Sequence, residues 1–155
     1  MMLYLPGDSF EIFVPRPAWD PGTAKTKGGF LSAAVENKLF LTSNALRSTH
    51  PQMRAKITRA WRYAAKQALR DKYPTGIHFK RLHAVSTFDK GFHNIYDAAN
   101  LYPVAKACID GFRDGGLLPD DDNRYLVGPD PRACEYPDIN NPGVYFRFTV
   151  LPEKE

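Results

Sequence analysis

The sequence predicts an α+β fold in which a small mixed or antiparallel sheet packs against two main helices. Two segments carry apolar residues at helical spacing, and several short segments rich in β-branched and aromatic residues alternate with them along the chain. With 155 residues, of which 43% are hydrophobic, the chain can bury one core without disulfide bonds. We therefore expect a single compact domain over residues 1–155.

The clearest helix is predicted over residues 51–72, where apolar residues recur at steps of three and four. A proline stands at its first position, and Ser48 or Thr49 is the expected N-cap. A second helix is predicted from Pro103 to the glycine pair 115–116, which suits the left-handed geometry of a helix C-terminus. Its core side is expected to hold Val104, Ala107, Cys108 and Phe112, and its polar face Lys106, Asp110 and Arg113.

Four strands are predicted, over residues 10–14, 77–88, 125–127 and 144–151. Residues 30–41 are ambiguous and indicate a short helical turn followed by a short strand at 39–41. Residues 20–29 indicate a basic loop, because they combine glycine, proline and lysine. The expected order is strand, helix, strand, helix, strand, strand.

The net charge of +4 is unevenly distributed along the chain. Residues 51–72 hold seven Lys and Arg against one acid, and residues 110–138 hold eight acids against three arginines. A basic segment suits phosphate groups and an acidic segment suits a cation. The alternative that both are simply solvated faces stays open.

Several common sites are excluded by spacing. Cys108 and Cys134 have no zinc-binding spacing, and a buried free thiol is expected at Cys108. The acidic segment is no EF-hand, because Arg124 and Tyr125 stand where a ligand and a glycine are required. Phosphate-cradling glycine motifs and the GxSxG elbow do not occur. The four histidines lack ligand spacing and are expected to be surface or strand residues: His50, His78, His83 and His93.

The chain has no apolar run near the ~20 residues that a membrane helix needs. Its first residues lack the basic and apolar regions of a signal peptide. We therefore expect a cytoplasmic protein that does not contact the membrane.

Residues 97–122 carry the candidate chemistry. Three adjacent aspartates, 120–122, follow the glycine pair, and Asp97 precedes the second helix. Adjacent carboxylates repel one another, which favours a compensating cation. If the chain doubles back, these acids approach one another as Mg²⁺ requires, with Lys106 orienting a carboxylate or a phosphate. The alternatives are a solvated turn and a surface pair of Lys106 with Asp110.

The same stretch resembles the signature of the RusA-like family of Holliday junction resolvases, many of them carried by phages. The likeness covers the larger part of the chain. It departs from the family at Ala99, where a metal-site aspartate is expected, at Ile95-Tyr96, where an arginine usually stands, and in a loop insertion around residues 20–40. The residues that match the family pattern are Asp97, Asn100, Leu101, Lys106, Asp110, Gly116, Asp120 and Asp121. Earlier in the chain, the matching segments are Phe13-Val14-Pro15, Leu41-Thr42-Ser43-Asn44 and Arg59-Ala60-Trp61-Arg62.

The resemblance implies a Mg²⁺-dependent crossover junction endodeoxyribonuclease, with Mn²⁺ able to substitute, that acts in DNA recombination and repair. It would hydrolyse phosphodiesters in branched DNA as a two-fold homodimer. The catalytic residues it implies are Lys106, Asp97 and Asp121, and the metal ligands are Asp97, Asp121, Asp120 and Asp110. With the charge pattern, it indicates DNA contacts at Asn44, Arg59, Arg62, Lys66 and Arg70, although Asn44 could instead cap a turn.

Two other functions stay open. One is a DNA-binding relative whose catalysis is weakened or lost through Ala99. The other is an acidic domain that binds a protein partner and no nucleic acid. An active nuclease would show Mg²⁺-dependent cleavage, which the DNA-binding relative would show weakly or not at all. Both would bind DNA with an affinity that falls with salt, whereas the protein-binding domain would not bind DNA.

Overall fold

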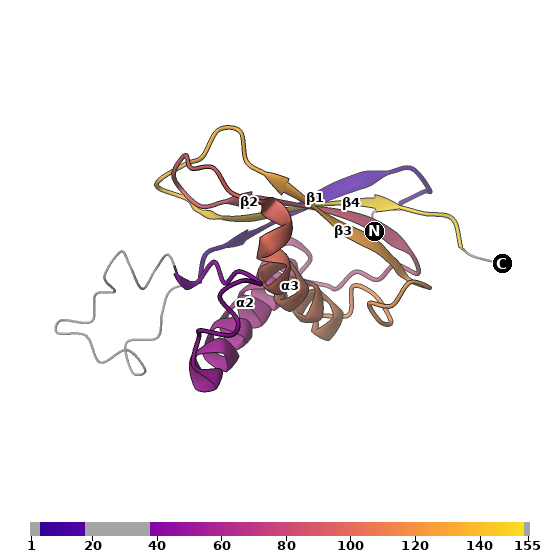
Figure 1. Ribbon diagram of the computed structural model, residues 1–155. Coiled ribbons are helices and arrows are strands. Elements are labelled where there is room, and N and C mark those ends of the chain that lie inside the picture. Colours follow the sequence, from indigo (N-terminus) through magenta and orange to yellow (C-terminus); the bar gives the residue numbers. More distant parts are fainter. Residues whose placement is uncertain (1–3, 18–37, 154–155) are drawn as a thin grey trace.

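Four strands form one mixed sheet in the order β1-β4-β2-β3 (Figure 1). The computed structural model describes residues 4–17 and 38–153. Strand β4 runs antiparallel to both β1 and β2, whereas β3 runs parallel to β2. The elements are β1 (Ser9–Pro15), α2 (Pro51–Lys72), β2 (Leu82–Asp89), the 3₁₀ helix η2 (Ala98–Leu101), α3 (Tyr102–Asp114), β3 (Leu126–Ala133) and β4 (Gly143–Val150). The predicted α+β class and the order of the elements are confirmed, and of the two sheet types left open the sheet is the mixed one.

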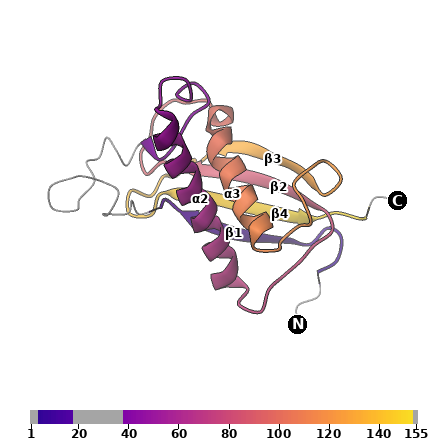
Figure 2. The ribbon, with the colours of Figure 1, turned by 90° about the horizontal axis from the view of Figure 1, so that it is seen from below.

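The two helices lie side by side over one face of the sheet (Figure 2). Strands β1, β2 and β4 bury alternate residues, among them Ile12 of β1 and Phe146 and Phe148 of β4. Helix α2 adds Trp61 and α3 adds Phe112, whose ring meets Phe146 edge to face at 5.0 Å. One contiguous hydrophobic core therefore holds the sheet and both helices together.

Helix α2 occupies the predicted span, but the predicted N-cap at Ser48 or Thr49 is wrong. Both hydroxyls donate to the Ala45 carbonyl oxygen, at 3.2 and 2.7 Å, and so belong to the preceding turn. His50 caps the helix instead, because its Nδ1 accepts from the Gln52 N–H at 3.1 Å. The local turn thus takes the two hydroxyls that were expected to serve the helix.

Helix α3 begins one residue earlier than predicted, directly after η2, and ends as the glycine pair indicated. Gly116 has a φ of 91°, and its N–H donates to the Arg113 carbonyl at 2.9 Å. The Leu117 N–H donates to the Phe112 carbonyl at 3.0 Å, so the two bonds form a Schellman motif. The predicted core side of α3 is confirmed, and Cys108 is a buried free thiol whose pKa is raised by burial.

Strands β1 and β4 match the prediction to within a residue at each end, but β2 and β3 differ from it. Strand β2 begins at Leu82, because residues 77–81 form a connection in which the Phe79 N–H bonds the Leu117 carbonyl at 2.9 Å. Strand β3 continues to Ala133 through two prolines, which an edge strand tolerates because its outer N–H groups need no partner in the sheet.

The short strand predicted at residues 39–41 does not form. The Leu39 carbonyl instead accepts from Trp61 Nε1 at 2.6 Å, and the three side chains join the core. A tertiary contact thus overrides the local β-propensity of the segment. The predicted insertion around residues 20–40 lies mainly outside the described residues. No helix in the described part of the chain is long and apolar enough to cross a membrane.

Candidate functional site

Five charged side chains meet beside α3 and form what we call the Lys106 cluster: Lys106, Asp110, Arg113, Asp120 and Asp121. Lys106 Nζ donates to Asp110 Oδ1 at 3.1 Å and also to Asp121 Oδ2. Arg113 Nη1 lies 3.3 Å from Asp120 Oδ1 and 3.4 Å from Asp121 Oδ1. Two cations therefore hold three carboxylates at one place.

Local structure explains why these residues meet. Asp110 lies one turn and Arg113 two turns after Lys106, so all three share one face of α3. The Schellman motif then reverses the chain, and buried Leu117 and Leu118 hold the returning segment against the core. The chain then runs back along α3, which brings Asp121 to Lys106 and Asp120 to Arg113. The sequence predicted such a reversal of the chain.

The cluster is a partly buried ion-pair network. The side chains of Asp121 and Asp110 are 15% and 18% exposed, whereas Lys106 is 42% exposed. The hydrogen bond from Lys106 lowers the pKa of Asp121 against the opposing effect of burial. Burial lowers the pKa of Lys106, but its hydrogen bonds to Asp121 and Asp110 outweigh this and raise it. The network therefore keeps Lys106 and Asp121 charged at neutral pH.

Asp122 does not share the cluster, although it adjoins Asp121 in sequence. Its carboxylate accepts from Arg124 Nε at 2.9 Å and from Nη2 at 2.7 Å. These bonds lower the pKa of Asp122 to about 2. The repulsion expected among three adjacent aspartates is thus relieved by Lys106, Arg113 and Arg124.

Asp97 has a structural contact of its own at the start of η2. Its Oδ1 accepts from the Ala99 N–H at 3.0 Å and caps the short helix. Ala99 lines a hollow of about 260 Å³ together with Ser86 and Phe88 of β2, Tyr102 and Ala105 of α3, and Pro129 and Pro131 of β3. The approach of Asp97 to residues 120–121 stays a prediction.

The Lys106 cluster offers only part of the donor set that a divalent cation needs. Within residues 4–17 and 38–153, no group of three or more His, Cys, Asp and Glu side chains is arranged to hold a metal ion. Asp110 and Asp121 nevertheless supply two largely buried carboxylates that both reach Lys106 Nζ. Mg²⁺ in enzymes is often held by only one or two carboxylates together with water and substrate phosphate. The pair therefore fits Mg²⁺ in donor type and number, with Asp120 adjacent.

The basic residues of α2 have different surroundings. Arg62 donates to Asp114 of α3 through Nε at 2.5 Å and Nη2 at 2.8 Å, which raises the pKa of Arg62 and lowers that of Asp114. Lys66 also interacts electrostatically with Asp114. Arg59 and Arg70 are exposed. The helix thus offers some of its basic residues to solvent and uses Arg62 to bind α3.

Asn44 is exposed in the turn that follows residues 39–41. Thr42 Oγ1 caps this turn by accepting from the Ala45 N–H at 3.1 Å. The Ser43 N–H donates to the Asn100 carbonyl at 2.7 Å, which places the turn against η2. Asn44 therefore lies on the same side of the molecule as the start of α3. The four histidines are surface or strand residues, as predicted.

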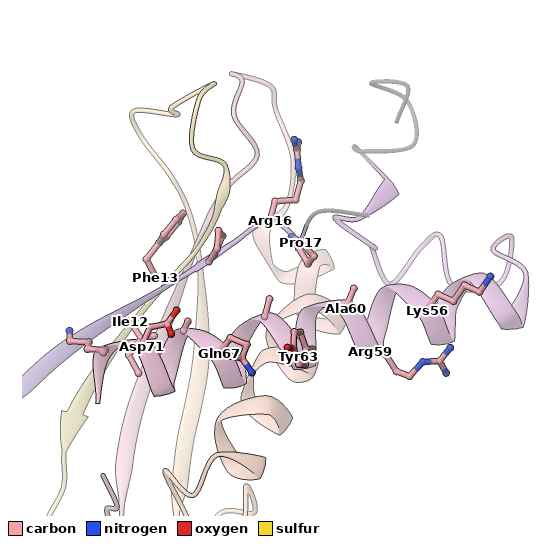
Figure 3. A pocket seen from close by; sticks show the side chains of 14 residues that line it. Ile12, Phe13, Arg16, Pro17, Lys56, Arg59, Ala60, Tyr63, Gln67 and Asp71 are labelled. Carbon is pink, nitrogen blue, oxygen red and sulfur yellow. The ribbon is translucent and has the colours of Figure 1, made fainter. Parts of the chain in front are cut away.

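Sequence reasoning missed a groove between β1 and α2 with a volume of about 1130 Å³ (Figure 3). Its walls are Ile12, Phe13 and Pro15 of β1, the following Arg16 and Pro17, and one face of α2 from Lys56 to Lys72. The two walls are more than 30 residues apart in sequence, so spacing could not indicate it. The one available signal was the edge position implied by the prolines that end β1.

The chain matches no protein-family model, and it matches no curated protein.

Proposed function

We propose that this protein is a Mg²⁺-dependent endonuclease that cuts branched DNA. The observation that supports it most is the Lys106 cluster, where two largely buried carboxylates share one lysine of α3. The RusA-like pattern of residues 97–121 supplies the substrate class, a four-way junction or a similar branch.

The roles of the residues follow from their contacts. Asp110 and Asp121 would hold the cation, with Asp120 and Asp97 as further carboxylates. Lys106 donates to both Asp110 and Asp121 and so orients them, and its ammonium can donate to a phosphate oxygen once substrate enters. Arg113 adds positive charge beside Asp121, which favours an approaching phosphate. Bound Mg²⁺ would supply a water of lowered pKa and offset charge on the phosphate.

Binding of DNA is assigned to polar groups of α2 and of the turn that precedes it. Arg59 and Arg70 are available to backbone phosphates, with Lys66 and the exposed Asn44 as further contacts. Arg62 joins them only when its pair with Asp114 is exchanged for a phosphate. Contacts of this kind to phosphate give affinity that falls steeply with salt.

A homodimer in the cytoplasm completes the proposal. A four-way junction has two-fold symmetry and must be nicked in two strands, so two sites related by a two-fold axis suit it. Light scattering with and without junction DNA measures the assembly. A monomer of 17.5 kDa under both conditions would remove the dimer from the proposal.

The test uses a labelled four-way junction and a linear duplex of the same sequence, each with Mg²⁺ and with EDTA. We expect Mg²⁺-dependent cleavage of the junction and little cleavage of the duplex. Salt-sensitive binding without cleavage would favour the non-catalytic function, and absence of binding to either DNA would refute both.

One observation favours a catalytically weakened relative as the second candidate. Ala99 lines the 260 Å³ hollow with mainly apolar neighbours, so a methyl group stands where the resemblance expects a carboxylate. On this alternative, Ala99→Asp raises Mg²⁺-dependent cleavage above that of the parent protein. On the leading proposal the parent already cleaves, and the substitution brings no gain.

A further inference from the structure

The groove between β1 and α2 has a composition that the Lys106 cluster does not explain. One face of α2 lines it, with Lys56, Ala60, Tyr63, Gln67 and Asp71 recurring at steps of three and four residues. Figure 3 shows these side chains along the helix, with Phe13, Arg16 and Pro17 from β1 and its continuation on the opposite wall. The groove therefore joins the edge of the sheet to the exposed side of α2.

The charge of the groove is strongly one-sided. Its lining includes four basic residues and a single acid, Asp71. The four basic residues are Arg16, Lys56, Arg59 and Lys72. The ammonium of Lys72 donates to the Glu11 carbonyl, whereas Arg59 is exposed and Lys56 half-buried. An extended anion is the ligand that this rim favours.

An aromatic ring stands between the basic residues. Tyr63 is 65% exposed, although it lies in the middle of a helix that buries Trp61 and Ala65 completely. The floor beside it is apolar and low, because Ala60, Ala64 and Ala68 present only methyl groups. A flat ring over a shallow apolar floor with cations along the rim is the arrangement by which proteins hold unpaired bases and their phosphates.

We propose that this groove binds a single strand of DNA, with a base stacked on Tyr63 and phosphates beside Lys56 and Arg59. An unpaired base is required, because a ring inside a groove cannot stack on a base that is already stacked in a duplex. The proposal rests on the proposed nuclease function for its choice of DNA and adds a second contact surface, distinct from the Lys106 cluster. Branched DNA exposes unpaired or easily unpaired bases at its crossover.

A second copy of this chain is the main competing occupant, and charge argues against it. A two-fold dimer closed over the groove would bring the basic rims of both copies together. Like charges at such an interface oppose association. Single-stranded DNA has the opposite charge, so its binding is not opposed by this repulsion.

The test measures fluorescence anisotropy of a labelled oligothymidylate of about 15 nucleotides in EDTA, which separates binding from cleavage. We expect Tyr63→Ala to weaken binding about tenfold and Tyr63→Phe to retain it, because phenylalanine keeps the stacking ring. Lys56→Ala should reduce the dependence of log affinity on log salt by about 0.7. Lys80→Ala is the matched control, since Lys80 is exposed outside the groove and pairs with Glu153 at 2.9 Å.

Circular dichroism of each variant shows whether the fold is kept. Unchanged binding by folded Tyr63→Ala and Lys56→Ala would overturn the proposal, as would equal losses for Lys80→Ala. So would a dimer that these variants convert to monomer, because a second copy would then occupy the groove. A protein that binds the oligonucleotide through Tyr63 but never cleaves a junction would support the groove and refute the nuclease function.

Discussion

Asp121→Asn gives the sharpest test of the candidate site. The substitution keeps the volume of the side chain and leaves an oxygen that can still accept from Lys106, but it removes the negative charge. In the structure this carboxylate is 15% exposed and accepts from both Lys106 and Arg113. The change therefore isolates the charge of Asp121 from its packing.

The expected loss of stability is small. A hydrogen bond to a charged group contributes about 1.5–3 kcal/mol net, and half-exposed Lys106 reduces that range by solvent screening. Since asparagine keeps a neutral hydrogen bond, we expect unfolding free energy to fall by about 1 kcal/mol. The protein should stay folded at neutral pH.

The expected loss of catalysis is large by comparison. If Asp121 helps to hold the cation, cleavage should fall by about 100-fold or more, which corresponds to about 2.7 kcal/mol of transition-state stabilisation. Junction binding should persist or tighten, because a negative charge near a polyanion is removed. The assay is single-turnover cleavage of a labelled junction with Mg²⁺, with anisotropy in EDTA for binding.

Asp122→Asn is the matched control, since Asp122 adjoins Asp121 but bonds Arg124 outside the cluster. It should cleave at the rate of the parent protein. Cleavage by Asp121→Asn at the parental rate would refute the mechanism, and equal losses in both variants would show that the effect does not come from the Lys106 cluster.

Three further predictions concern stability and binding. Gly111→Ala should destabilise the fold by about 3 kcal/mol in urea denaturation, because its Cβ would collide with the Arg62 carbonyl and lie 2.9 Å from the Ala65 Cβ; a change below about 1 kcal/mol would contradict the close helix packing. The stabilising charge of Asp121 is present above its unfolded-state pKa of about 3.9 and is lost as pH falls through the lowered folded-state pKa. The stability difference between parent and Asp121→Asn should therefore stay constant from neutral pH down to about pH 4 and shrink below it, and a constant difference at lower pH would exclude the ion pair as its source. Arg59→Ala should weaken junction binding more than Arg62→Ala, because Arg62 already pairs with Asp114; the reverse ranking would show that DNA displaces this pair.

Local patterns were sufficient for much of the fold. The span of α2, the glycine end of α3 and the strands β1 and β4 follow from periodicity and from residues that stop an element. Prediction failed where a distant partner decides the conformation. Residues 39–41 have the composition of a strand, yet the indole of Trp61 takes the Leu39 carbonyl. Strand β3 contains prolines that local rules read as breaks, and only its edge position allows them.

In the candidate site, too, contacts within one element follow from the sequence, whereas contacts between elements do not. The sequence by itself determined that Lys106 and Asp110 share a face of α3, because helical spacing places residues four apart together. Only the tertiary structure decided that Asp121 turns to Lys106 while Asp122 turns to Arg124, and that Arg62 binds Asp114. Such contacts depend on how α2, α3 and the returning segment pack on one core. The groove beside β1 was decided in the same way, since its two walls meet only when α2 lies across the sheet.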